Sequence, residues 1–209
     1  MKGILGLLRH KTPPEPAEER LDSMLFTTAF TDREASASPL VPWEARAAEI
    51  GASRLSPSQG TKLLQGLWAR DKFMCQLDQD AIARMERFFD FATVAAKREL
   101  IRQDELGNFM LVLLRGRIAI DRLQPWGEHL RLAEAGPGEI LGEMSLLDSG
   151  IRLSVCSTLS DCNIAVLSAD ALDQMLGADP ALAANLIALL ARKLSLRMRV
   201  ISARLNDKK

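Results

Sequence analysis

The chain has no tyrosine, and only two histidines and three cysteines among its 209 residues. Two histidines cannot supply the several imidazoles and the carboxylate of a cupin metal centre, and His10 lies in the N-terminal tail. Cys75, Cys156 and Cys162 are odd in number and lack CxxC spacing, which disfavours a disulfide framework and a zinc knuckle. We therefore expect reduced thiols in the core and no metal site.

Long apolar runs are also absent, and neither sign of charge is in excess. No run approaches the roughly 20 residues of a membrane-spanning helix. The opening "MKGILGLLRHK" is broken by Arg9, His10 and Lys11, with no small-residue cleavage site after it, so it does not predict a signal peptide. Twenty-seven Lys and Arg balance 27 Asp and Glu, so charge supplies no long-range attraction to nucleic acid or membranes. These features favour a cytoplasmic protein that is not associated with a membrane.

Catalytic motifs are missing as well. The sequence contains no GxSxG, no GxxxxGK[ST], and no Cys/His pair in a local context for nucleophilic catalysis. We expect no catalytic residues, and a protein that is not an enzyme.

The first part of the chain divides into an arm and a helical segment. Residues 1–55 are rich in Pro and Ala, which predicts a partly ordered arm that docks through apolar residues such as Trp43. Residues 56–92 predict a helical lead-in, because Ser56-Pro57 is a helix start and a second start follows at Asp78. The expected buried residues of the two helices are Leu63, Leu64, Leu67 and Trp68, then Ala81, Ile82, Met85, Phe88 and Phe89.

Residues 93–178 change to short strand-like runs separated by Gly, Pro, Asn and Asp turns. Such spacing is typical of an antiparallel, double-layered barrel of about eight strands. The fold class predicted is α+β, mainly β: a double-stranded β-helix, or jelly-roll-like β-roll, with N-terminal helices and a long C-terminal helix. The runs are "ELIRQ", "FMLVLL", "RIAIDRL", "EHLRLA", "EILGE", "RLSVCSTL" and "NIAVL".

Residues 179–209 predict the long helix, which begins at Asp179-Pro180. Its apolar residues recur at steps of three and four and form one drifting stripe. We expect the first part of the stripe to pack on the barrel and the distal part to pair with a second copy of the chain. The stripe comprises Leu182, Leu186, Leu190, Leu194, Met198, Ile201 and Leu205.

The segment "GEMSLLDSGIRLS", residues 142–154, combines features that suit a small phosphate ester. Gly142 allows close approach of the backbone, and the first N–H groups of the following turn have no partner within a helix. Arg152 offers a planar, charged fork to phosphate oxygens, while Glu143 can accept a hydrogen bond from a ribose hydroxyl. Without ligand, the two side chains can also pair with each other.

This segment resembles the phosphate-binding cassette of the cyclic nucleotide-binding domain family, which includes catabolite activators and regulatory subunits of cyclic-AMP-dependent kinase. Similarity extends over roughly residues 73–204. The resemblance implies that Glu143 holds the ribose 2′-hydroxyl and Arg152 the cyclic phosphate. It implies further that Gly142 and the amides of Met144 and Ser145 bind the phosphate, and that Leu132, Ala135 and Met144 line an apolar wall.

Two departures from the family pattern concern the ligand. Leu153 stands before Ser154 where the family has small residues, so it reduces the space beside the phosphate. Arg197 and Met198 stand where bacterial activators offer hydroxyls to adenine, and Arg197 could suit a guanine edge or a second phosphate, as in cyclic di-GMP. The resemblance therefore leaves the base open.

These features predict a cytoplasmic regulatory protein that binds a cyclic nucleotide, with cyclic AMP the first candidate, and signals through its C-terminal helix. The hinge after Leu167 would let that helix close on the base. Expected partners are a second copy and an unidentified protein. Since no helix-turn-helix follows the long helix before Lys209, we expect no direct DNA binding. The alternatives are a ligand-free scaffold for protein interactions and an adaptor that touches membranes through "MKGILGLL".

Overall fold

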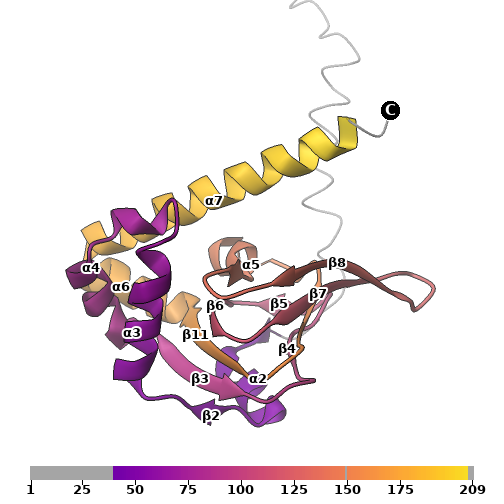
Figure 1. Ribbon diagram of the computed structural model, residues 1–209, viewed down its shortest axis with the longest axis horizontal. Helices are drawn as coiled ribbons and strands as arrows, with labels where there is room; N and C mark the ends of the chain where they lie inside the picture. The colour runs from indigo at the N-terminus through magenta and orange to yellow at the C-terminus, as the bar shows by residue number, and fades with distance from the viewer. Residues whose placement is uncertain (1–39, 149, 207–209) are drawn as a thin grey trace, which may run out of the picture. The chain divides into compact units, whose positions relative to one another are not determined.

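The computed structural model describes residues 40–148 and 150–206, without the side chains of residues 201 and 204–206. The predicted arm up to residue 39 lies outside the described residues, as do the side chains of Ile201 and Leu205 in the predicted stripe. In the described part, two antiparallel sheets form a β-roll that lies between the long helix α7 and the short helix α2 (Figure 1).

The predicted fold class is confirmed. One sheet has the strand order β4-β10-β7-β8 and the other the order β2-β3-β11-β6-β9. A short parallel pair, β1 with β5, stands apart from both. The strands are β1 Leu40–Val41, β2 Ser53–Arg54, β3 Asp90–Val94, β4 Glu99–Ile101, β5 Leu106–Gly107, β6 Phe109–Arg115, β7 Ile118–Leu123, β8 His129–Ala135, β9 Ile140–Leu141, β10 Val155–Thr158 and β11 Cys162–Ser168.

Strand β6 explains why the core has two parts. Successive side chains of a strand point to opposite faces. Phe109, Leu111 and Leu113 therefore enter a cluster inside the roll, whereas Met110, Val112 and Leu114 pack against the helices. Both faces of β6 are buried, which is why its sequence is apolar without alternation.

The lead-in helices begin where the sequence predicts. Helix α3 spans Pro57–Trp68, and α4 spans Gln79–Met85. Asp78 caps α4 by accepting a hydrogen bond from the amide of Ala81 at 2.6 Å. The second helix is shorter than expected, because Phe88 lies in the separate 3-10 helix η2, Glu86–Phe88, and Phe89 follows it. A further 3-10 helix, η1, spans Met74–Gln76.

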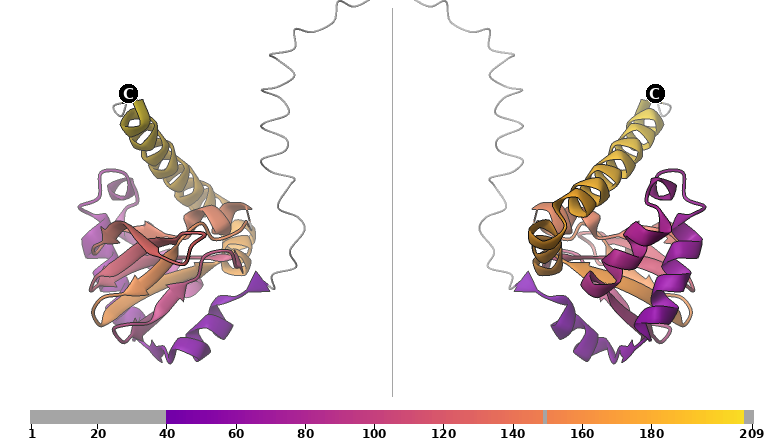
Figure 2. Two further views of the ribbon diagram at one scale, coloured as in Figure 1. Left: turned by 90° about the vertical axis from the view of Figure 1, so that its right-hand side faces the viewer. Right: turned by 90° about the vertical axis from the view of Figure 1, so that its left-hand side faces the viewer.

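The C-terminal part of the chain forms two helices after β11. Helix α6 spans Ala169–Ala178, and the long helix α7 spans Pro180–Asn206. Leu182, Leu186 and Leu190 of the predicted stripe are buried, but Met198 is 60% exposed. The first half of α7 thus packs on its own domain, and the C-terminal end of the helix extends away from the β-roll (Figure 2). No helix in residues 40–148 or 150–206 combines the length and apolar character needed to cross a membrane.

Residues 40–54, which the sequence analysis assigns to the arm, are ordered elements of this domain. Helix α2 spans Trp43–Ile50 and ends at Gly51, whose φ of +67° is a left-handed cap. Trp43 enters the inner cluster of the roll, and Arg46 is only 1% exposed.

The cysteine prediction is right for two of the three residues. Cys156 and Cys162 are free and buried, but Cys75 is exposed and is no core thiol. It lies in η1, between α3 and α4, where its neighbour Met74 is buried in the core but Cys75 belongs to neither core cluster.

Candidate functional site

The predicted cassette forms one wall of a hollow of about 170 Å³. Gly142 ends the turn after β9, and the helix α5, Glu143–Asp148, begins directly after it. The loop from Ile151 to Ser154 forms a second wall, and α7 contributes one residue from far along the chain. The predicted residues brought together here are Gly142, Glu143, Met144, Ser145, Arg152, Leu153, Ser154 and Arg197.

Glu143 pairs with Arg197 and not with Arg152, which corrects the expected ligand-free pair. Arg197 Nη1 donates to Glu143 Oε1, and its Nη2 donates to the carbonyl of Ile140 at 2.8 Å. The Glu143 side chain is 7% exposed, whereas Arg197 is 44% exposed. A buried carboxylate thus has its charge satisfied by a guanidinium that reaches down from α7.

Arg152 lines the same hollow, and its guanidinium is held by backbone carbonyls and an aromatic ring of the roll. Its Nη1 donates to the carbonyl of Gly142 at 3.0 Å, and its Nη2 donates to the carbonyl of Phe109 at 2.7 Å. Its Cζ stands 4.4 Å from the centre of the Phe109 ring, a cation–π geometry. Arg152 is 4% exposed, so the surrounding backbone and ring replace most of its hydration.

Two glycines make this close packing possible. A Cβ at Gly142 would stand 2.5 Å from Arg152 Nη1, and a Cβ at Gly107 would collide with Arg152 Nε. Gly142 also has a φ of +78°, a conformation that favours glycine. Arg152 therefore occupies space that side chains at either position would fill.

The electrostatics of the hollow follow from burial. Desolvation lowers the pKa of Arg152 to about 10, against the raising effect of Cys156, Glu105 and Glu143 nearby. Desolvation also raises the pKa of the Cys156 thiol to about 12. At neutral pH Arg152 is therefore charged and the Cys156 thiol is neutral.

Two predicted residues do not lie in this hollow. Leu132 is 49% exposed on β8, and Ala135, at the end of the same strand, is buried in the inner core. The strand β8 is an edge strand of its sheet, and neither residue is part of the wall. Leu153 lines the hollow but is 47% exposed, so its side chain does not fill it.

The apolar wall comes instead from residues that the sequence analysis did not select. Ile101 of β4, Ile120 of β7 and Cys156 of β10 belong to adjacent strands of one sheet and face the hollow together. Buried residues do not alternate cleanly along these strands, and strand order was needed to combine the three residues. Leu141 and Ile151 complete the wall.

In the part of the chain that the structure describes, no group of three or more His, Cys, Asp and Glu residues is placed to hold a metal ion. The chemistry of the hollow is that of hydrogen bonds and charge: a buried carboxylate acceptor, two guanidinium groups and backbone amides.

The two packed sheets, the short helix after β9 and the long final helix define the cyclic nucleotide-binding β-roll fold. Residues 92–179 match the family model described as Cyclic nucleotide-binding domain.

Two curated relatives match part of the chain. The cyclic AMP receptor protein of Thermus thermophilus is 34% identical over 97 residues, which cover 46% of this chain and 45% of that protein. A CRP-like cAMP-activated global transcriptional regulator of Mycobacterium tuberculosis is 25% identical, over 56% of this chain and 53% of that protein. The chain spans about half the length of these relatives.

A solved structure has a similar fold over more of the chain. The crystal structure of a cyclic nucleotide-binding domain from Methylobacillus flagellatus covers 76% of this chain and 89% of that domain, with a TM-score of 0.68. At 23% sequence identity, this similarity concerns the fold.

Proposed function

We propose that this protein is a regulatory protein, not an enzyme, and that it binds a cyclic nucleotide, cyclic AMP first among them, in the hollow beside α5. The observation that carries the proposal is the convergence of Glu143, Arg152 and Arg197 on one hollow. A ribose hydroxyl and a cyclic phosphate need a hydrogen-bond acceptor and a fixed cation a few ångströms apart, and this arrangement offers both.

The identity of the nucleotide draws support from the two curated relatives. Both are named for cyclic AMP, and each matches about half of this chain. Gly142 and the amides of Met144 and Ser145 would contact the phosphate, with Arg152 completing its charge neutralisation. Leu153 and Ser154 would border the sugar and phosphate.

The contact between Glu143 and Arg197 links the ligand to the long helix. A ribose hydroxyl that binds Glu143 competes with Arg197 for the same carboxylate oxygens. The hollow of about 170 Å³ is also smaller than the roughly 300–1,000 Å³ of typical small-molecule sites. Ligand entry would therefore withdraw Arg197 and shift α7, and this movement is the signal passed to a second copy or another partner.

Calorimetric titration of cyclic AMP, cyclic GMP and cyclic di-GMP into the protein tests the proposal, with 5′-AMP as the acyclic control. We expect heat with cyclic AMP and little with 5′-AMP. Arg152→Lys should weaken cyclic AMP binding at least roughly tenfold, since one fixed charged hydrogen bond is worth about 1.5–3 kcal/mol. Arg117→Lys is the matched control, because Arg117 is exposed on the turn before β7 and outside the hollow. Absence of heat with all three cyclic nucleotides at millimolar concentration would refute the proposal.

A second candidate is a ligand-free scaffold, and one observation favours it. Glu143 and Arg152 both have hydrogen-bond partners within the protein: Arg197 for Glu143, and two backbone carbonyls for Arg152. A scaffold of this kind would bind its protein partner equally well with Arg152→Lys and without any nucleotide. The same titration therefore separates the two functions.

A further inference from the structure

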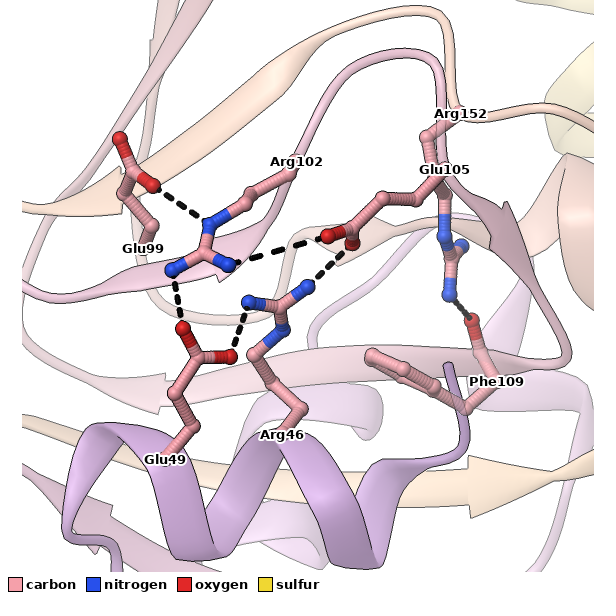
Figure 3. Close-up of polar contacts among 7 residues, drawn as sticks. All are labelled: Arg46, Glu49, Glu99, Arg102, Glu105, Phe109 and Arg152. Carbon is pink, nitrogen blue, oxygen red and sulfur yellow. Dashed lines mark hydrogen bonds and ion pairs between the residues drawn. The ribbon is translucent and has the colours of Figure 1, made fainter. Parts of the chain in front are cut away.

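Helix α2 contributes no residue to the wall of the hollow, yet it touches the residues that surround Arg152. Its Arg46 is almost fully buried and donates to the carboxylates of Glu49, at 2.7 Å, and of Glu105. Arg102 of the loop after β4 approaches Glu105 at 3.8 Å from the other side. The Glu105 carboxylate is thereby held between two guanidinium groups (Figure 3).

Glu105 is also a backbone neighbour of Arg152. The amide of Arg152 donates to the carbonyl of Glu105 at 2.8 Å, and Leu106 forms a β-bridge with Ile151. Figure 3 shows the Glu105 side chain turned toward Arg46 and Arg102, while the Arg152 side chain runs toward Phe109. The side chains of Glu105 and Arg152 have opposite charges and extend in different directions from paired backbone positions.

A second contact connects α2 with the other side of Arg152. The Trp43 ring packs edge-on against Phe109, with 5.7 Å between ring centres. Phe109 in turn carries the Arg152 guanidinium over its ring. The position of Arg152 therefore depends on a ring that α2 supports.

We propose that Arg46 is a positioning residue for Arg152: by pairing with Glu105, it keeps that carboxylate from capturing the guanidinium that the cyclic nucleotide requires. Without Arg46, the partly buried Glu105 carboxylate would still have Arg102 nearby, but Arg102 is 40% exposed. The carboxylate would therefore form an ion pair with the buried guanidinium of Arg152. A guanidinium paired with Glu105 would leave Gly142 and Phe109 and would bind phosphate less well. This inference rests on the proposed function for its ligand, but the positioning of Arg152 is measurable without one.

The test compares Arg46→Gln, Glu105→Gln and the double variant, with Arg102→Gln as the matched control. Arg102→Gln also removes a cation beside Glu105, but it leaves Arg46 in place, so it corrects for the general loss of positive charge. The first measurement, on the ligand-free protein, is the NMR signal of the Arg152 Nε–H group, assigned by its loss in Arg152→Lys. The second is calorimetric titration with cyclic AMP.

We expect the Arg152 signal to shift in Arg46→Gln, to return in the double variant and to stay in place in Arg102→Gln. Cyclic AMP affinity should fall roughly tenfold in Arg46→Gln and recover in the double variant, since the competing carboxylate is then gone. If Arg46 had a purely structural role, removing Glu105 as well would restore neither the Arg152 signal nor the cyclic AMP affinity. If Arg46→Gln does not fold, Arg46→Lys, which loses the guanidinium fork, should shift the signal in the same direction by less.

An unchanged Arg152 signal in the Arg46 variants, or no return in the double variant, overturns the inference while leaving nucleotide binding intact. A shift that returns as expected, in a protein that gives no heat with cyclic AMP, cyclic GMP or cyclic di-GMP, supports the positioning and refutes the proposed function. A shift without any change in affinity, in a protein that binds cyclic AMP, overturns the role of Arg46 in ligand binding.

Discussion

Arg197 of α7 donates a hydrogen bond to the Glu143 carboxylate at the start of α5, 54 positions earlier in the chain. The pair joins a buried carboxylate to a half-exposed guanidinium, and the proposed function assigns this carboxylate to a ribose hydroxyl. Closure of the hollow and the placement of the long helix are therefore linked through one ion pair.

Replacement of Arg197 should strengthen ligand binding. In Arg197→Met the Glu143 carboxylate loses its internal partner, so a ribose hydroxyl no longer competes with a guanidinium. We expect cyclic AMP affinity to rise roughly tenfold and the ligand-free protein to lose about 1–3 kcal/mol of stability, because a buried acceptor is left unpaired. Arg199→Met, on the exposed surface of the same helix, is the control and should change neither. Weaker binding by Arg197→Met would mean that Arg197 contacts the ligand instead.

A methyl group at Gly142 should displace Arg152. Gly142→Ala combines the strain of a positive φ with a Cβ 2.5 Å from Arg152 Nη1 and 3.1 Å from the Phe109 carbonyl oxygen. We expect a loss of about 2–4 kcal/mol in the free energy of unfolding, measured by urea denaturation. At Gly51 the φ is similarly positive, but a Cβ would meet nothing within 4 Å. Gly51→Ala should therefore cost only about 1–2 kcal/mol, and equal losses for the two variants would contradict the crowding around Arg152.

The ion pair between Lys193 of α7 and Asp71 should contribute less to the free energy of unfolding as the pH falls. Lys193 of α7 donates to Asp71 at 2.5 Å, and Asp71 also accepts from the amides of Phe73 and Met74. Burial alone would raise the Asp71 pKa, but the bond from Lys193 and those two amides hold it below the ordinary value of 3.8. Since the folded pKa is the lower one, the contribution is complete well above pH 3.8 and is lost as the pH falls through the folded value.

Urea denaturation at pH 6, 4 and 3 checks this dependence. Asp71→Asn should be less stable than the original chain by about 0.5–1 kcal/mol at pH 6, and the difference should shrink as the pH falls. Asp80→Asn is the control, because Asp80 is exposed in the first turn of α4 and has no ion pair in the described residues. A difference that grows in acid would contradict the assignment.

The tryptophans provide a direct comparison of α2 with an exposed loop. Trp43 is 4% exposed in the inner core, whereas Trp126 is 69% exposed on the turn between β7 and β8. Trp43→Ala should reduce the free energy of unfolding by about 3–5 kcal/mol, and Trp126→Ala by less than about 0.5 kcal/mol. Thermal denaturation followed by circular dichroism measures both. Similar midpoints would show that α2 does not stabilise the roll.

Much of the architecture was predictable because its signals are local. The Asp179-Pro180 start and the leucine steps after it predict α7, and Asp78 predicts the start of α4. The cassette residues lie within thirteen consecutive positions, from Gly142 to Ser154, so one loop and one short helix gather most of them.

Other features depended on information that the sequence carries weakly. Helix α2 was missed because the Pro- and Ala-rich composition outweighed a short pattern: Trp43, Arg46 and Ile50 are spaced by three and four and lie between Pro42 and Gly51. The sequence pattern indicated Arg197 as a contact for a nucleotide base or a second phosphate, but not as the partner of Glu143. That pairing depends on how α7 is rotated over the roll, which no local pattern fixes.

The tight enclosure of Arg152 has a consequence for how this domain diverges. Gly107 and Gly142 both lie where any larger residue would intrude on the guanidinium. Among descendants of this gene, a substitution at Gly107 or Gly142 should persist only where Arg152 has already been replaced by a residue with a smaller side chain. The three positions should therefore vary as one inherited unit, even though Gly107 lies well outside the nucleotide cassette.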